Sequence, residues 1–234
     1  MANFSTHLTV ASVASSMLAS LVVTVRGEQI EEAIIYFFAG ALGGILPDID
    51  SDNSAALKFI FTLFAVLISA FMMVQLADEY AIATLWVICI TSFLLVRFGL
   101  IQVFAKFTVH RGIFHSISSA LFFWFSTTIL CFHVVGLSSL QSWLIGLFIF
   151  LGYTIHLLLD ELYSVDLFNV RIKRSFGTAF KFVYLKSATA SLCMIAMILI
   201  TFKYTPPIDR FTHLILSQET YQTIYKKLIP EKLL

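Results

Sequence analysis

The sequence predicts an all-α, polytopic transmembrane helical bundle of about six to seven spans, with a metal site at one membrane face. Of its 234 residues, 59% are hydrophobic and only 12% are charged, and the mean hydropathy is +0.91. This is too little polar surface to cover a water-soluble globule of this length. Several apolar runs reach the roughly 20 residues that a helix needs to cross a bilayer, so we expect one compact bundle.

Seven apolar runs are predicted to form the helices, because short joins with Gly, Pro or charged residues separate most of them. The first run lacks the basic start of a signal peptide and stays apolar for longer, so we expect a retained span. The composition leaves open whether the seventh run crosses the bilayer. The runs cover residues 4–25, 30–46, 56–77, 81–104, 114–136, 140–159 and 187–202.

Four polar motifs are the candidates for chemistry. If the chain crosses the membrane once with each apolar run, all four motifs lie at the same membrane face. A shared functional site explains this agreement more naturally than chance. Lys and Arg residues, among them five between residues 171 and 186, also gather at this face, so the positive-inside tendency predicts that it is cytoplasmic. The motifs are Thr6-His7, Leu46-Pro47-Asp48-Ile49-Asp50-Ser51, His110-Arg111-Gly112-Ile113-Phe114-His115-Ser116, and His156 with Asp160.

The spacing within these motifs favours metal binding. His156 and Asp160 are four residues apart, which places both side chains on one helix face, one turn apart. Charges beside apolar spans are costly, and a cation would compensate clustered carboxylates. Imidazole and carboxylate ligands suit zinc, manganese or iron, so we expect one or more divalent ions, zinc first. The predicted ligands are His7, Asp48, Asp50, His110, His115, His156 and Asp160.

Simpler interpretations compete with this one. A single His or Asp at a membrane edge is commonly a helix cap or a hydrogen-bonding group between helices. Arg111 could bind a phosphoryl oxygen or anchor the chain at the interface, and Glu161 could be a general base or a solvated side chain. The residues predicted to act on a substrate are Asp50, Arg111 and Glu161. Both remaining histidines, His133 and His213, are expected to be structural.

The four motifs resemble those of the YdjM-like family of membrane-bound metal-dependent hydrolases. That pattern contains Thr-His, Leu-Pro-Asp-x-Asp-Ser, His-Arg-Gly-x-Thr-His-Ser and His-x-x-x-Asp, and the resemblance covers about residues 1 to 165. Phe114 stands where the family commonly has Thr, which removes a hydroxyl that could orient a ligand. The family is distantly similar to zinc-dependent phospholipases C, so the resemblance implies a phosphoester substrate.

We therefore expect a hydrolase that cleaves a phosphoester of an anionic phospholipid or lipid-linked phosphate by metal-activated water, in a bacterial inner membrane. Residues 1–186 would form the hydrolase domain, and residues 187–234 the last apolar helix and an amphipathic tail. No basic block with interleaved aromatic residues points to nucleic acid. Two alternatives stay open: a divalent-metal or proton-coupled transporter, and a non-catalytic membrane adaptor with a structural metal.

Overall fold

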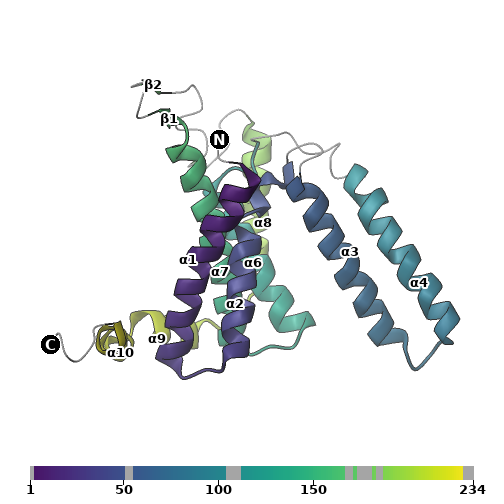
Figure 1. Ribbon diagram of the computed structural model, residues 1–234, viewed down its shortest axis with the longest axis horizontal. Coiled ribbons are helices and arrows are strands. Elements are labelled where there is room, and N and C mark those ends of the chain that lie inside the picture. The colour runs from purple at the N-terminus through teal and green to yellow at the C-terminus, as the bar shows by residue number, and fades with distance from the viewer. Residues whose placement is uncertain are drawn as a thin grey trace. The chain divides into compact units, whose positions relative to one another are not determined.

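A computed structural model describes residues 3–50, 55–103, 112–166, 171–172, 181–182 and 187–228 (Figure 1). The predicted helical fold class is confirmed, and a hairpin of two short antiparallel strands follows one of the helices. The elements are α1 (Phe4–Arg26), α2 (Ile30–Gly43), the 3-10 helix η1 (Leu46–Asp50), α3 (Ala55–Leu76), α4 (Ile82–Leu94), the π-helical η2 (Leu95–Leu100), α6 (Ile117–Ile129), the π-helical η3 (Leu130–Val134), α7 (Ser139–Leu162), β1 (Val165–Asp166), β2 (Arg171–Ile172), α8 (Ala188–Lys203), α9 (Asp209–Leu216) and α10 (Gln218–Leu228).

Within the described part of the chain, five helices are long and apolar enough to cross a membrane. Two further predicted spans are shorter: α2 has 14 residues and α8 has 16. The second run was expected to stay helical to residue 46, but the helix ends at Gly43 and a 3-10 helix follows. Glycine has poor helix propensity and Pro47 cannot continue the α-helical pattern, which explains the earlier end. The five long helices are Phe4–Arg26, Ala55–Leu76, Ile82–Val103, Ile117–Val134 and Ser139–Leu162.

The chain forms two compact units, one made of Met1–Pro47 with His115–Leu234 and the other of Asp48–Phe114. The second unit is a hairpin in which α3 and α4 lie side by side. Ser69 donates its hydroxyl to the carbonyl of Cys89 at 3.0 Å, and the Cys89 thiol donates back to the carbonyl of Ser69. The domain boundary predicted at residue 186 falls inside the first unit and stays a prediction.

Helix α7 is the centre of the first unit. It packs against α1, α2, α6 and α9, and 61% of its apolar window is buried, compared with 22% or less in the other four long helices (Figure 1). Trp143, Phe148 and Tyr153 are among its fully buried side chains. Large aromatic groups bury the most apolar area per residue, so α7 supplies much of the core.

Glycines allow α2 and α7 to meet backbone to backbone. A Cβ atom at Gly152 would overlap the carbonyl of Gly40, and one at Gly43 would overlap the carbonyl of Ile149. Small residues at membrane helix interfaces permit this close approach, and dispersion contacts between the backbones then stabilise the pair. The glycines of α2 therefore fix its height and rotation against α7.

The first unit has two distinct ends. At one end, the N–H of Ile117 at the start of α6 donates to the carbonyl of Lys181, just before α8. At the other end, the residues that follow α8 are held by Trp143, whose Nε1 donates to the carbonyl of Pro206 at 3.2 Å. Helix α8 thus leads from the end where α1 begins to the end where α1 finishes. The tail helices α9 and α10 lie at this second end, which the sequence had left open.

The turn between α1 and α2 is also at the second end. Gly27 closes α1 in the left-handed conformation, with φ 68°, which only glycine adopts without strain. Arg26 forms an ion pair with Glu28, and the Tyr36 hydroxyl donates to the other Glu28 oxygen at 3.3 Å. Burial raises the pKa of Glu28, and the Arg26 charge partly offsets this increase.

The α2–α7 contact predicts a large effect for a very small substitution. Gly152→Ala should lower the free energy of unfolding by about 1–3 kcal/mol, because the added methyl group overlaps backbone that cannot move aside. Inside a helix, alanine is otherwise about 1 kcal/mol more favourable than glycine, so a lower stability of this variant reports the overlap of the added methyl group with α2. Thermal unfolding in detergent measures it.

Gly99→Ala is the matched control, because nothing lies within 4 Å of a Cβ atom at Gly99. It should leave the melting temperature unchanged or raise it slightly. Equal melting temperatures for the two variants would contradict the backbone contact.

Candidate metal centre

The first member of the site lies in the first turn of α1. Asn3 caps this helix, and its side chain accepts hydrogen bonds from the N–H of Thr6 at 2.8 Å and from the Thr6 hydroxyl at 2.7 Å. Asn is among the best residues for this role because its side chain satisfies an amide that the helix leaves free. The cap fixes where the helix begins, and His7 therefore turns into the unit, where it is buried.

His156 and Asp160 lie on the buried face of the last turns of α7, as their spacing predicts. Nδ1 of His156 lies 2.8 Å from the carbonyl oxygen of Gly44, just beyond the end of α2. A carbonyl can only accept, so Nδ1 carries the proton and the neutral ring presents a lone pair at Nε2. Histidines that bind metals commonly donate their other ring N–H to a backbone carbonyl in this way.

The third histidine comes from the start of α6. His115 precedes Ser116, the N-cap residue, whose hydroxyl accepts from the N–H of Ser119. His115 is 1% exposed and Ser116 is fully buried. The cap directs the chain into the unit immediately before α6, which brings His115 to the same end as the start of α1 and the end of α7.

The three imidazoles converge on the Asp160 carboxylate. Nε2 of His7 lies 3.3 Å from Oδ1, and Nε2 of His115 and of His156 lie 3.8 Å and 4.0 Å from Oδ2. The ligand atoms of His7, His156 and Asp160 all lie within 4.8 Å of one another. His7 and His156, which are 149 positions apart in the sequence, thus present ring nitrogens to the same carboxylate. Each residue of the site is 2% exposed or less.

The histidine rings also contact one another. His7 and His156 are stacked, with ring centroids 3.6 Å apart and planes 13° from parallel, and His115 meets His156 edge-on at 5.8 Å. Two protonated imidazoles at the stacking distance would repel strongly in a buried site. At least one ring of the stacked pair is therefore neutral, the form that ligates metals.

These distances fit a shared cation better than direct hydrogen bonds. A charge-assisted hydrogen bond between nitrogen and a carboxylate oxygen is about 2.7–2.9 Å long, shorter than all three separations. Four ligands around a tetrahedral zinc ion, each about 2.0–2.1 Å from it, lie about 3.3–3.4 Å apart. Among the described residues, no hydrogen-bond partner is found for Nδ1 of His7 or for either oxygen of Asp160. The residues present fit a divalent ion.

The sequence profile of the YdjM inner membrane protein family matches residues 1–215. The chain belongs to this family. No curated protein and no solved structure matches the chain.

Family membership confirms the predicted resemblance. The match extends beyond residue 165 and includes α8 and most of α9. The family name and the five long apolar helices identify this YdjM-family chain as an inner membrane protein. Which face of the membrane carries the histidine cluster stays a prediction.

The structure brings together four of the predicted site residues: His7, His115, His156 and Asp160. Asp48 lies in η1 within the other compact unit. Glu161 is half-buried on α7, one residue beyond Asp160 and so about 100° around the helix. The proposed roles of both stay predictions, as do those of three residues whose side chains lie outside the described part of this YdjM-family chain: Asp50, His110 and Arg111.

One member of the site was missed by sequence reasoning. The Gly44 carbonyl orients His156, and a Cβ atom at Gly44 would overlap that of Ala11 on α1. A backbone acceptor leaves no side-chain signal in a sequence. The signal that could have indicated it is the glycine spacing of Gly40, Gly43 and Gly44, which is typical of close helix contacts.

The geometry predicts that metal binding requires the histidines and the aspartate of the cluster, and that a histidine elsewhere in the chain does not contribute. Purified wild-type protein should hold a divalent ion in stoichiometric amount, and His115→Ala and Asp160→Asn should lose it, because each removes one ligand. Elemental analysis measures the ion. Asp160→Asn preserves the side-chain volume, so loss of metal is separable from unfolding.

His133→Ala is the matched control, because His133 is exposed and its Nε2 lies 3.1 Å from the carbonyl of Tyr204, away from the cluster. It should retain the metal. If His115→Ala and Asp160→Asn bind as much metal as the control, the cluster is not the site.

Proposed function

We propose that this YdjM-family protein is a membrane-embedded, metal-dependent hydrolase that cleaves a phosphoester of a phospholipid or lipid-linked phosphate. The observation that carries the proposal is the convergence of three buried imidazoles on the Asp160 carboxylate at one end of the helical unit. Nitrogen and carboxylate ligands of this kind suit zinc first, and manganese or iron as alternatives.

The residues of the cluster have separate tasks in this proposal. Bound zinc would act as a Lewis acid toward a phosphoryl oxygen and lower the pKa of water. His156 is held in one ring orientation by the Gly44 carbonyl, so it presents Nε2 without having to reorient. Asp160 supplies the negative charge that a divalent ion requires, and its position one turn from His156 makes the pair a chelate.

The place of the cluster along the helices supports a lipid substrate. His7 is in the first turn of α1, and Asp160 is in the last turn of α7, so both are close to the ends of candidate spans. Span ends lie near the depth of lipid headgroups, where a phosphoester of a membrane lipid is found. We propose Arg111 for contact with a phosphoryl oxygen, Glu161 as general base and Asp50 as a further ligand.

One observation favours the structural-metal alternative and sharpens the test. The ligand atoms of His7, His156 and Asp160 lie within 4.8 Å of one another and Nε2 of His115 lies 3.8 Å from Asp160, so these residues offer as many donors as a closed tetrahedral site needs, and each of the four is 2% exposed or less. Structural zinc sites are closed in this way, whereas catalytic sites keep one position for water or substrate. At a site closed by all four residues, hydrolysis would require that one of them yields to substrate. The transporter alternative is less favoured, because transport sites lie near the bilayer midplane.

Hydrolysis of phospholipid should require an intact histidine and aspartate cluster. Wild-type protein in liposomes loaded with zinc should release phosphorylated headgroup from a labelled phospholipid, and Asp160→Asn should reduce the rate by more than about a hundredfold. Chromatographic quantification of the released headgroup measures both. His133→Ala should keep the wild-type rate.

Metal bound in stoichiometric amount without hydrolysis of any phospholipid or lipid-linked phosphate would refute the enzymatic role and favour the structural metal. Zinc flux into sealed liposomes, lost in Asp160→Asn, would instead favour the transporter.

A further inference from the structure

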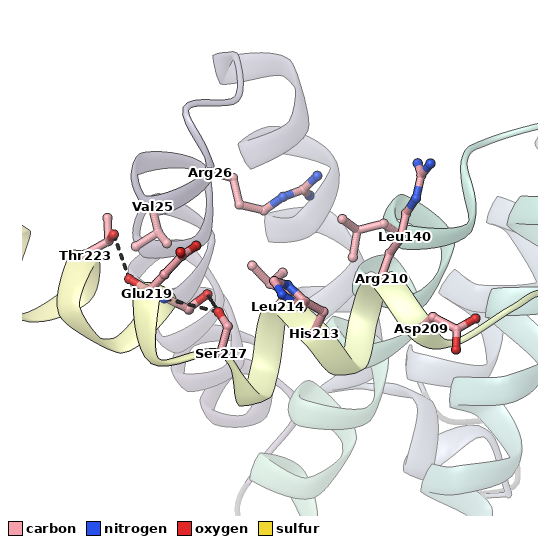
Figure 2. A pocket seen from close by; sticks show the side chains of 11 residues that line it. Val25, Arg26, Leu140, Asp209, Arg210, His213, Leu214, Ser217, Glu219 and Thr223 are labelled. Atoms are coloured by element: carbon pink, nitrogen blue, oxygen red, sulfur yellow. Dashed lines mark hydrogen bonds between the residues drawn. The ribbon is translucent and has the colours of Figure 1, made fainter.

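A second candidate site lies at the other end of the first unit. A recess of about 680 Å³ opens between the end of α1, the start of α7 and the tail helices α9 and α10. Arg26, Leu140, Arg210, His213 and Glu219 are among the residues that line it (Figure 2). Helix α1 has 23 residues, so its two ends are about 34 Å apart and this recess is separate from the histidine cluster.

Both signs of charge face this recess. Figure 2 shows Arg26 and Arg210 extending from different helices on the same side of α9, with His213 between Arg210 and Glu219. Arg26 is paired with Glu28, but a guanidinium has five donors, so it retains capacity for a second acceptor. The side chains of Arg210 and Glu219 form no ion pair or hydrogen bond with the described residues.

The recess continues into an apolar one. A smaller cavity of about 150 Å³ shares Val25, Arg26 and Leu214 with the larger one. The other residues that line it include Leu21 and Leu144, which lie about one turn deeper along α1 and α7. Charge at the helix ends therefore gives way to an apolar lining toward the interior of the unit. A phospholipid has the same order, with a charged headgroup above its acyl chains.

The tail helices have the character of segments that lie at a membrane surface. In α9, Phe211 is buried and its ring stacks on Trp143 with centroids 5.5 Å apart, whereas Leu216 is 75% exposed. In α10, Tyr221 and Tyr225 are exposed and the last turn carries lysines. Exposed aromatic residues together with lysines are typical of helices that lie among headgroups.

We propose that this recess binds a phospholipid whose headgroup carries an ammonium group. Its phosphate contacts Arg210, Arg26 and His213, its ammonium group faces Glu219, and the first carbons of one acyl chain occupy the apolar cavity beside Leu144. Guanidinium groups match phosphate oxygens in geometry as well as charge. Asp209 and Glu219 disfavour a headgroup with net negative charge, so phosphatidylethanolamine fits better than phosphatidylglycerol.

Native mass spectrometry of the detergent-purified full chain tests this assignment. Wild type should bind phosphatidylethanolamine more tightly than phosphatidylglycerol, and Arg210→Ala should weaken phosphatidylethanolamine binding about tenfold or more. Lys226→Ala is the matched control, because it removes the same charge from an exposed residue of α10 outside the recess. It should leave binding unchanged.

A second variant tests the acyl chain. Val22→Phe partly fills the apolar cavity and should also weaken phosphatidylethanolamine binding, with unfolding of the lipid-free protein as the check on its fold. Equal effects of Arg210→Ala and Lys226→Ala, or a preference for phosphatidylglycerol, would overturn the proposal. Equally tight binding of soluble glycerophosphoethanolamine would overturn it as well, because the recess would then bind the headgroup alone. Metal content and hydrolysis are not part of this readout, so its outcome is independent of the histidine cluster.

Discussion

The close contact between α2 and α7 is the constraint on which the rest of the first unit depends. Gly43 and Gly152 lack the side chains that would otherwise separate the two helices, so their backbones touch. This contact sets the height of α2 and places the Gly44 carbonyl beside Nδ1 of His156. The orientation of a candidate metal ligand is therefore set by helix packing, and the fold and the site share one interaction.

The sequence was sufficient to predict the features that depend on local pattern. Apolar run lengths predicted the helices, and the four-residue spacing of His156 and Asp160 predicted their common face. The convergence of His7 and His115 on the same end followed from alternating the direction of successive spans. Helix period and bilayer thickness are fixed physical lengths, so the spacing of residues in the sequence is enough to encode these features.

Features that depend on tertiary contact were beyond the sequence. The stacking of His7 on His156 and the Gly44 hydrogen bond join residues from different helices, and no spacing encodes them. The early end of α2 was also missed, because hydropathy does not distinguish an apolar glycine run from a continuing helix. The place of the tail became clear only from the contacts of Trp143 with the Pro206 carbonyl and Phe211.

The shortness of α2 has a consequence for the surrounding membrane. Its 14 residues span about 21 Å, whereas a bilayer's hydrocarbon core is about 30 Å thick. Ile30, Ile34 and Phe38 on this helix are exposed, so its outer face is apolar. Local thinning of the bilayer is one way in which such a hydrophobic mismatch is relieved. The membrane beside α2 would then be dimpled, and headgroups would descend toward the end of the unit where the histidines lie.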